Sequence, residues 1–222
     1  TTASNNTAVG YQAGYSNTTG ANVNAFGQTA AYSNTTGEIT AIGSSCLYSN
    51  TTGTLNTAIG TASLYSNTTG GNNVAVGRDT LRSNTTASNN TAVGYQAGYS
   101  NTTGAYNTFI GQSSGYGNTT GTLNTGLGRL SIGGQSVGVT GVENIAVGNA
   151  SLLNVTSGSF NFAGGDETLR YNTTGSACVA IGHQALWSNQ TASYNTAVGY
   201  QAGYSNTTGT ANSFLGYQAG YS

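Results

Sequence analysis

The chain has 222 residues, only 4% of which are charged, and its net charge is −1 at pH 7. Soluble globular domains carry roughly 25% charged residues, so this is not the composition of an ordinary globular domain. The arginines are scattered, which excludes a basic surface for nucleic acid or anionic lipid. No apolar run approaches the roughly 20 residues needed to span a bilayer, so we expect no membrane insertion in this segment.

A motif with the consensus N-T-A-V-G-Y-Q-A-G-Y-S-N-T-T-G-A-x recurs thirteen times, and we number its positions 1 to 17. The glycine of position 5 is Gly10, Gly27, Gly43, Gly60, Gly77, Gly94, Gly111, Gly128, Gly148, Gly165, Gly182, Gly199 and Gly216. Ten of the twelve intervals are 17 residues, one is 16 and one is 20. We therefore expect one repeat array over 1–222, irregular near 129–148. It starts and stops mid-repeat, like a piece of a longer fibre.

Positions 2 to 4 of the motif alternate in character. Position 4 is apolar in all repeats but one, position 3 is nearly always Ala, and position 2 is mostly Thr. Position 4 holds Val9, Phe26, Ile42, Ile59, Val76, Val93, Ile110, Leu127, Val147, Ile181, Val198 and Leu215, with Gly164 as the exception. A period of two residues predicts a β-strand with positions 2 and 4 on one face, which we expect to form the core. On this assignment Val93→Asp disrupts the fold, whereas Thr102→Asp in a turn is mild.

The N-T-T-G of positions 12 to 15 has the small, polar residues of a tight turn. The glycine of position 5 allows a corner or a close backbone approach. Two short strands and two turns in 17 residues make one coil. The sequence thus predicts an all-β parallel β-solenoid, or β-roll, of about thirteen turns, with like positions stacked about 4.8 Å apart.

Position 10 of the motif is mainly aromatic, which predicts a ladder of stacked rings. Its aromatic members are Tyr15, Tyr32, Tyr48, Tyr65, Tyr99, Tyr116, Trp187, Tyr204 and Tyr221. We expect Arg82 between Tyr65 and Tyr99, and Arg170 beneath Trp187, to make cation–π contacts. The ladder is interpreted as packing or as a partner interface, in preference to a strip that binds surface glycan. A thin core and apolar positions 9 and 10 favour a homo-oligomer, most plausibly a trimer.

Position 12 supplies N-x-T sequons, which leave two interpretations open. The Asn residues concerned are Asn17, Asn34, Asn50, Asn67, Asn84, Asn101, Asn118, Asn172, Asn189 and Asn206. We favour turn chemistry; the alternative is a row of glycosylation sites in a chain that meets an oligosaccharyltransferase. The Thr pairs of positions 13 and 14 also raise ice binding, which we favour less because these Thr residues lie in a turn.

Few residues offer chemistry, and we expect neither an enzyme nor a cofactor or metal site. Cys46 and Cys178 lie eight coils apart, about 38 Å on the ladder spacing, too far for a disulfide. We expect both to be free and buried. Asp166 and His183 occupy position 6 of adjacent repeats, which could imitate part of a triad, but a surface ion pair is the favoured interpretation. No Cys/His cluster has zinc spacing.

The N-T-A-V-G and N-V-A-V-G segments at 6–10 and 73–77 resemble the S-V-A-I-G motif of trimeric autotransporter adhesin heads. The Y-Q-A-G-Y-S-N-T-T-G phrase resembles repeats of tail-fibre-like proteins of phages and bacteria. The resemblance covers the whole chain and implies a trimeric β-roll, although the adhesin repeat is about 14 residues long. It implies a structural fibre segment, a spacer or attachment rod, that is extracellular or on a cell or virion surface. The alternative is a self-assembling extracellular filament with glycosylated sequons; a glycan- or ice-binding solenoid comes third.

Overall fold

The computed structural model describes residues 3–134 and 138–222, which form thirteen short β-strands, one in each coil, and no helix. The strands are β1 (Thr7–Val9), β2 (Val23–Phe26), β3 (Ile39–Ile42), β4 (Asn56–Ile59), β5 (Val74–Val76), β6 (Thr91–Val93), β7 (Thr108–Ile110), β8 (Thr125–Leu127), β9 (Ile145–Val147), β10 (Phe162–Gly164), β11 (Val179–Ile181), β12 (Thr196–Val198) and β13 (Ser213–Leu215). The predicted parallel β-solenoid with coils of about 17 residues is confirmed.

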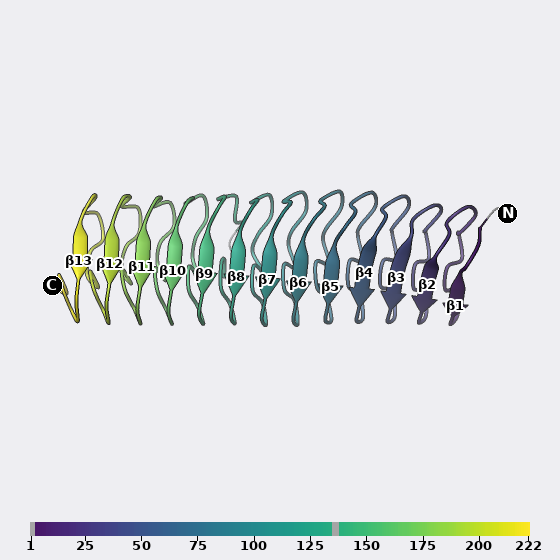
Figure 1. The fold of residues 1–222 in the computed structure, drawn as a ribbon, viewed down its shortest axis with the longest axis horizontal. Coiled ribbons are helices and arrows are strands. Elements are labelled where there is room, and N and C mark those ends of the chain that lie inside the picture. Colours follow the sequence, from purple (N-terminus) through teal and green to yellow (C-terminus); the bar gives the residue numbers. More distant parts are fainter. Residues whose placement is uncertain (1–2, 135–137) are drawn as a thin grey trace. The chain divides into compact units, whose positions relative to one another are not determined.

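The chain divides into two compact units, Thr1–Asn107 with β1–β6 and Thr108–Ser222 with β7–β13. In each unit every strand pairs in parallel with the strand of the next coil, as the ribbon of Figure 1 shows. The register joins identical positions: Thr57 pairs with Val74, and Ile59 pairs with Val76. Like residues therefore stack in columns along each unit.

The strand faces the opposite way from the sequence-based assignment. Ala58 and Ala75 at position 3 are fully buried, whereas Ile59 at position 4 is 38% exposed and Val74 at position 2 is 37% exposed. The assignment of positions 2 and 4 to the core is wrong. The alternation separates two faces, but it does not say which one is inside. The interior behind the strand is shallow, and so it takes the alanine row.

Two coils show how little space this interior has. Phe109 takes the place of the usual Ala at position 3 and is fully buried. Position 9 of the same coil is then Gly115, where an added Cβ would overlap the Phe109 ring. Phe214 repeats the arrangement with Gly220. A large side chain at position 3 thus requires the loss of the side chain at position 9, because the interior is close-packed.

Position 9 supplies most of the large side chains of the core, although we expected it on an outer face that favours self-association. Its buried members are Ala31, Leu47, Leu64, Leu81, Ile132, Leu152, Leu169 and Leu186. These residues have φ near +50°, for example 49° at Leu64. The left-handed conformation costs roughly 1–2 kcal/mol, which is offset by the roughly 1.5–3 kcal/mol from burying a leucine side chain.

Each described coil contains a single strand, and the predicted second strand is replaced by turns. Positions 7, 9 and 17 are left-handed in nearly every coil, as at Ala62, Leu64 and Asn72. Their N–H groups bond to neighbouring coils: Ala62 N–H donates to Ser44 (2.9 Å) and Leu64 N–H to Thr80 (3.0 Å). The backbone hydrogen bonds therefore join coil to coil on every side, and not only at the strands.

The glycine of position 5 lies where the coils approach most closely. At Gly60 φ is +129°, and an added Cβ would be 2.5 Å from the carbonyl oxygen of Gly77 in the next coil. A side chain at this position would need both an unfavourable backbone conformation and a wider separation of the coils. The predicted corner is therefore also a point of backbone contact.

Two columns made mainly of asparagine, at positions 1 and 12, form another part of the interior. At position 12, Asn84 Nδ2 donates to Asn67 Oδ1 (2.8 Å) and to the Ala87 carbonyl (3.0 Å). At position 1, Asn73 Nδ2 donates to Asn56 Oδ1 (3.1 Å) and to the same Ala87 carbonyl (2.9 Å). Buried amides need such partners, and these chains of bonds supply them in coil after coil.

The irregular coil of the second unit contains residues 135–137, which lie outside the described residues. On its far side the ladder resumes: Asn118 forms a bridge with Val139, and the Thr119 N–H donates to the Val139 carbonyl at 2.9 Å. The extra residues of this 20-residue interval thus leave the stacking of the flanking positions unchanged.

Candidate functional site

Aromatic rings of position 10 stack in the first unit. Neighbouring ring centroids are 5.1–5.2 Å apart, with interplanar angles of 4–8°, for Tyr15, Tyr32, Tyr48 and Tyr65. Arg82 continues the column: its guanidinium carbon is 5.3 Å from the Tyr65 ring centroid and 5.8 Å from that of Tyr99. The position predicted for Arg82 is confirmed.

The second unit carries a shorter aromatic column. Trp187 stacks on Tyr204 at 5.0 Å, and Tyr204 stacks on Tyr221 at 5.1 Å. Arg170 does not lie beneath Trp187 as predicted. Its guanidinium lies over the ring of Tyr171 at 5.8 Å, and Tyr171 meets Trp187 edge to face at 4.5 Å. A ring at position 11, which the motif analysis did not consider, takes the contact.

The stacking decides what these columns can bind. Inside a column each ring lies between neighbouring rings or beside the guanidinium of Arg82, so the flat faces of these inner rings are covered. A sugar that stacks on an aromatic residue needs an open ring face. The columns therefore contribute packing energy, about 0.5–1.5 kcal/mol for each stacked pair, and offer no platform for a sugar ring along their length.

The acid–histidine pair lies at the surface of the second unit. His183 Nδ1 is 3.5 Å from Asp166 Oδ2, and both side chains are more than 40% exposed. Asn149 donates to the other oxygen of Asp166 at 2.8 Å, and Tyr200 stacks on His183. Among the described residues no serine joins this pair, so it is a solvent-exposed contact between an imidazole and a carboxylate that lacks a nucleophile.

Position 7 carries a column of side-chain amides beside that pair. Gln218 donates to Gln201 (3.0 Å), Gln201 to Gln184 (2.8 Å) and Gln184 to Glu167 (2.8 Å). Glu167 also forms an ion pair with Arg170. The Glu167 carboxylate is thus occupied by two donors, and this run of side chains joins coil to coil.

Both cysteines are free and buried, as predicted, one in each unit. Burial raises the pKa of the Cys46 thiol to about 12, and Cys46 Sγ donates to the Gly43 carbonyl at 3.0 Å. Burial also raises the pKa of Cys178. Both thiols stay protonated at neutral pH, so neither is a nucleophile. In the part of the chain that the structure describes, no group of three His, Cys, Asp or Glu side chains could hold a metal ion.

The sequon asparagines lie inside the coil and not along an edge. Asn34, Asn50, Asn67, Asn84, Asn101, Asn118, Asn172 and Asn189 are fully buried, and the outermost two, Asn17 and Asn206, are partly buried. The Nδ2 atoms to which a glycan would attach donate to the carbonyl of position 15, for example Asn50 to Gly53 at 2.9 Å. These asparagine amides are thus engaged in the turn, which is the interpretation favoured from the sequence. Glycosylation of the sequons stays the alternative prediction.

The Thr pairs beside these asparagines differ in their roles. At position 13 the hydroxyl donates to the backbone of the next coil, as Thr51 does to Thr68 and Thr68 to Thr85, at 3.0–3.1 Å. At position 14, Thr52 and Thr69 are exposed. Only one hydroxyl group of each adjacent Thr pair is free of this backbone contact, so the pairs do not form a regular surface of hydroxyl groups.

The outer face of the strands is the surface that the sequence analysis missed, because it was taken for the core. It consists of positions 2 and 4 of each coil. In the second unit, β9–β11 present an apolar strip in which each residue is 38–42% exposed: Ile145, Val147, Phe162, Val179 and Ile181. In the first unit, Thr replaces most of the apolar residues at position 2. No signal in the sequence identified this face, because the larger residues of positions 2 and 4 were the natural choice for a core.

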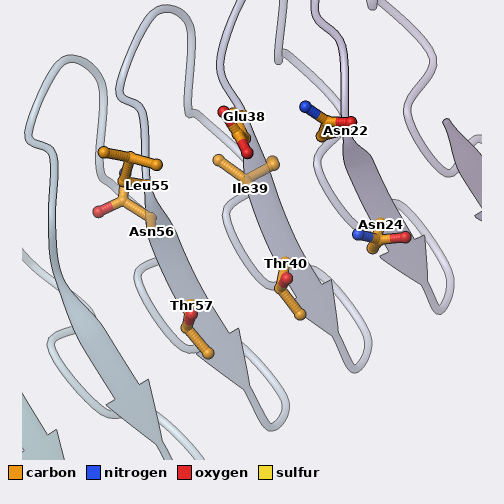
Figure 2. Close-up of a pocket in the computed structure, with 8 residues that line it drawn as sticks. All are labelled: Asn22, Asn24, Glu38, Ile39, Thr40, Leu55, Asn56 and Thr57. Carbon is orange, nitrogen blue, oxygen red and sulfur yellow. The ribbon is translucent and has the colours of Figure 1, made fainter. Parts of the chain in front are cut away.

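The best-formed hollow on the first unit is a shallow groove across β2–β4, shown in Figure 2. It is lined by Asn22, Asn24, Glu38, Ile39, Thr40, Leu55, Asn56 and Thr57. Its volume is about 240 Å³, below the roughly 300–1,000 Å³ of small-molecule sites. It holds one carboxylate and no second titratable group, so acid–base chemistry has no pair to work with.

The described residues include no helix that is long and apolar enough to span a membrane. Comparison with protein-family models, curated proteins and solved structures found no match to this chain. Function must therefore be argued from the fold and its surfaces.

Proposed function

We propose that this chain is a structural segment of an extracellular fibre, serving as a spacer or attachment rod on a cell or virion surface. The proposal extends the resemblance of its repeats to adhesin heads and tail-fibre-like proteins. The candidate chemical groups do not gather in one place: the cysteines are buried, and the acid–histidine pair is solvated. A structural role needs none of them.

One observation carries the proposal. Within each unit, each coil is hydrogen-bonded to the next through strands, turns and two asparagine columns. Such an array can be lengthened by adding copies of one motif, because each copy contacts only its neighbours. This property suits a segment that acts as a spacer.

The apolar strip on β9–β11 supports side-by-side association with a second copy of the chain. It contains no charged side chain, and its residues repeat at the spacing of the coils. Another copy of the same strip has the same spacing, so two sheets can pack face to face with their side chains interdigitated. Exposed apolar strips of this kind mark interaction surfaces. We propose a homo-oligomer formed through this strip. A trimer is the expected state, with three strips packed around a common axis, as the resemblance to adhesin heads implies.

The test is sedimentation of the chain together with negative-stain imaging. We expect an oligomer of short, straight particles. Phe162→Glu combined with Ile181→Glu should give monomers of unchanged circular dichroism. Thr174→Glu, an exposed turn residue, serves as the matched control and should leave the oligomer intact. A wild-type monomer at all concentrations would contradict association through the strip.

A self-assembling filament is the second candidate. Coils pair in parallel and in register with their neighbours, as β1 does with β2 and β12 with β13, and the same pairing could join two copies of the chain end to end. Strand edges add further strands in this way. Continuous filaments in the images, unaffected by the Phe162 and Ile181 substitutions, would favour end-to-end assembly over the spacer.

A further inference from the structure

The outer face of β3–β6 in the first unit differs from the apolar strip of the second unit. Position 2 is Thr40, Thr57, Val74 and Thr91, and position 4 is Ile42, Ile59, Val76 and Val93. Every one of these residues is β-branched. All are half-exposed or exposed, and no charged residue occurs among them. The face is therefore made of two rows of hydroxyl and methyl groups.

The strand register places these groups on a grid. Thr40 pairs with Thr57, Thr57 with Val74, and Val74 with Thr91, and the position 4 residues follow the same register. Parallel pairing fixes about 4.8 Å between coils and about 6.6 Å between positions 2 and 4 of a strand. Figure 1 shows β3–β6 side by side and pointing the same way. β-Branched side chains have few χ1 rotamers in a strand, so the groups on the grid are held in place.

The hydroxyl groups of this face are uncommitted. Thr40, Thr57 and Thr91 have no side-chain hydrogen bond to any described residue, unlike the position 13 hydroxyl of Thr51, which donates to the Thr68 carbonyl. Figure 2 shows Thr40 and Thr57 side by side on neighbouring strands. Their hydrogen-bonding capacity is directed to solvent. The neighbouring methyl groups restrict the orientation of first-shell water.

We propose that the outer face of β3–β6 binds the surface of ice. A rigid, uncharged grid with a repeat comparable to that of the oxygen atoms in hexagonal ice can hold water in positions that continue the crystal. Hydroxyl groups hold that water by hydrogen bonds, and methyl groups order it without forming hydrogen bonds to it. The proposal is independent of the fibre role and moves the ice-binding face from the turn threonines to the strand.

A second copy of the chain is a poorer occupant for this face than for β9–β11. Packing two such faces together would bury the Thr40, Thr57 and Thr91 hydroxyls. Without partners, each would cost roughly 1–3 kcal/mol. Ice supplies donors and acceptors at every site of the grid and so avoids that cost.

The experiment measures thermal hysteresis and ice recrystallisation inhibition with the full chain. We expect wild-type protein to shape growing ice crystals and to lower the freezing point below the melting point. Thr57→Tyr places a bulky side chain in the middle of the grid and should abolish both effects. Thr69→Tyr, in an exposed turn of the same coil, should leave them unchanged. Circular dichroism and the melting temperature establish that both variants are folded.

Absence of both effects in folded wild-type protein overturns the proposal. Equal losses in the Thr57 and Thr69 variants overturn the assignment to this face. If sedimentation shows that Thr57→Tyr dissociates an oligomer while no variant affects ice, the face is a protein interface and the proposal fails.

Discussion

The buried asparagine amides connect more groups than any other side chain of this fold. Asn84 donates to Asn67 and to the Ala87 carbonyl, and it accepts from Asn101 Nδ2 at 2.9 Å. Removing one such amide leaves several buried groups without a partner. This makes position 12 more sensitive than its polar character suggests.

We predict that Asn84→Ala lowers the free energy of unfolding by about 3 kcal/mol or more, since each unsatisfied buried group costs roughly 1–3 kcal/mol. Urea denaturation followed by circular dichroism measures the change. Thr86→Ala, at an exposed position of the same turn, should change stability by less than about 0.5 kcal/mol. Similar losses in both variants would show that the amide column contributes little.

From the raised pKa of the buried Cys46 thiol we predict that the folded chain loses stability in alkali. Its pKa rises from 9.0 for an ordinary thiol to about 12 in the folded chain, because burial disfavours the thiolate. Above pH 9 the unfolded chain loses this proton while the folded chain keeps it. The free energy of unfolding should therefore fall as pH rises from 9.0 toward about 12, by up to about 1.4 kcal/mol per pH unit.

Cys46→Ser tests this directly. Ser63 occupies the same position in the next coil and donates to the Gly60 carbonyl at 3.0 Å, so serine fits the site. The variant should keep its stability at neutral pH. In denaturant titrations its free energy of unfolding should fall less in alkali than that of wild type. Identical pH profiles would contradict the assignment to this thiol.

At the scale of the strand, neighbouring residues face opposite environments. Ala92 is fully buried on β6, and Val93 beside it lies on the outer face. The sequence revealed the alternation and therefore the strand. It could not reveal the inward side, because an interior lined with alanine is unusual and the larger residues were the natural choice for a core.

Which face of the strand is buried can be tested with one pair of substitutions. Ala92→Asp buries a carboxylate without a partner and should prevent folding. Val93→Asp should cost about 1 kcal/mol or less and leave circular dichroism unchanged. The reverse order of effects would restore the assignment made from the sequence.

The turns that contain positions 7, 9 and 17 were harder to predict than the strand. Positions 7, 9 and 17 adopt left-handed conformations with non-glycine residues such as Ala62, Leu64 and Asn72. Leucine does not signal positive φ, and only the burial of its side chain offsets the strain. For that reason the prediction of a second strand in each coil was wrong.

At the scale of the whole chain, the 17-residue period determined the fold correctly. Periodicity survives substitution at single positions, so the solenoid, its coil length and the stacking of like residues could all be predicted. The surfaces could not, because they depend on which way each side chain points. The burial of the sequon asparagines could not be predicted either, since a sequon looks alike inside and outside a coil.

Nearest-neighbour stacking predicts that one whole coil can be removed. Deletion of 73–89 keeps the phase of the motif and should bring β4 against β6, with Tyr65 stacked directly on Tyr99 once Arg82 is gone. The variant should unfold cooperatively with a lower midpoint, because one interface between coils is lost. Thermal melts and near-ultraviolet circular dichroism measure both effects.

A deletion that breaks the phase is the control. Removing 78–85 should abolish folding around the joint, because positions that differ in size and polarity would then be stacked. Equal tolerance of the two deletions would argue against a fold organised by nearest-neighbour coils.

The bare backbone at position 5 has a consequence for the whole array. Gly60 allows its coil to approach Gly77 so closely that an added methyl group would meet the carbonyl oxygen. The spacing set by the strand ladder is thus possible only because this residue has no side chain, and the amide columns and aromatic stacks share that spacing. Replacing this hydrogen by a methyl group would wedge two coils apart and loosen every column that crosses the gap at once.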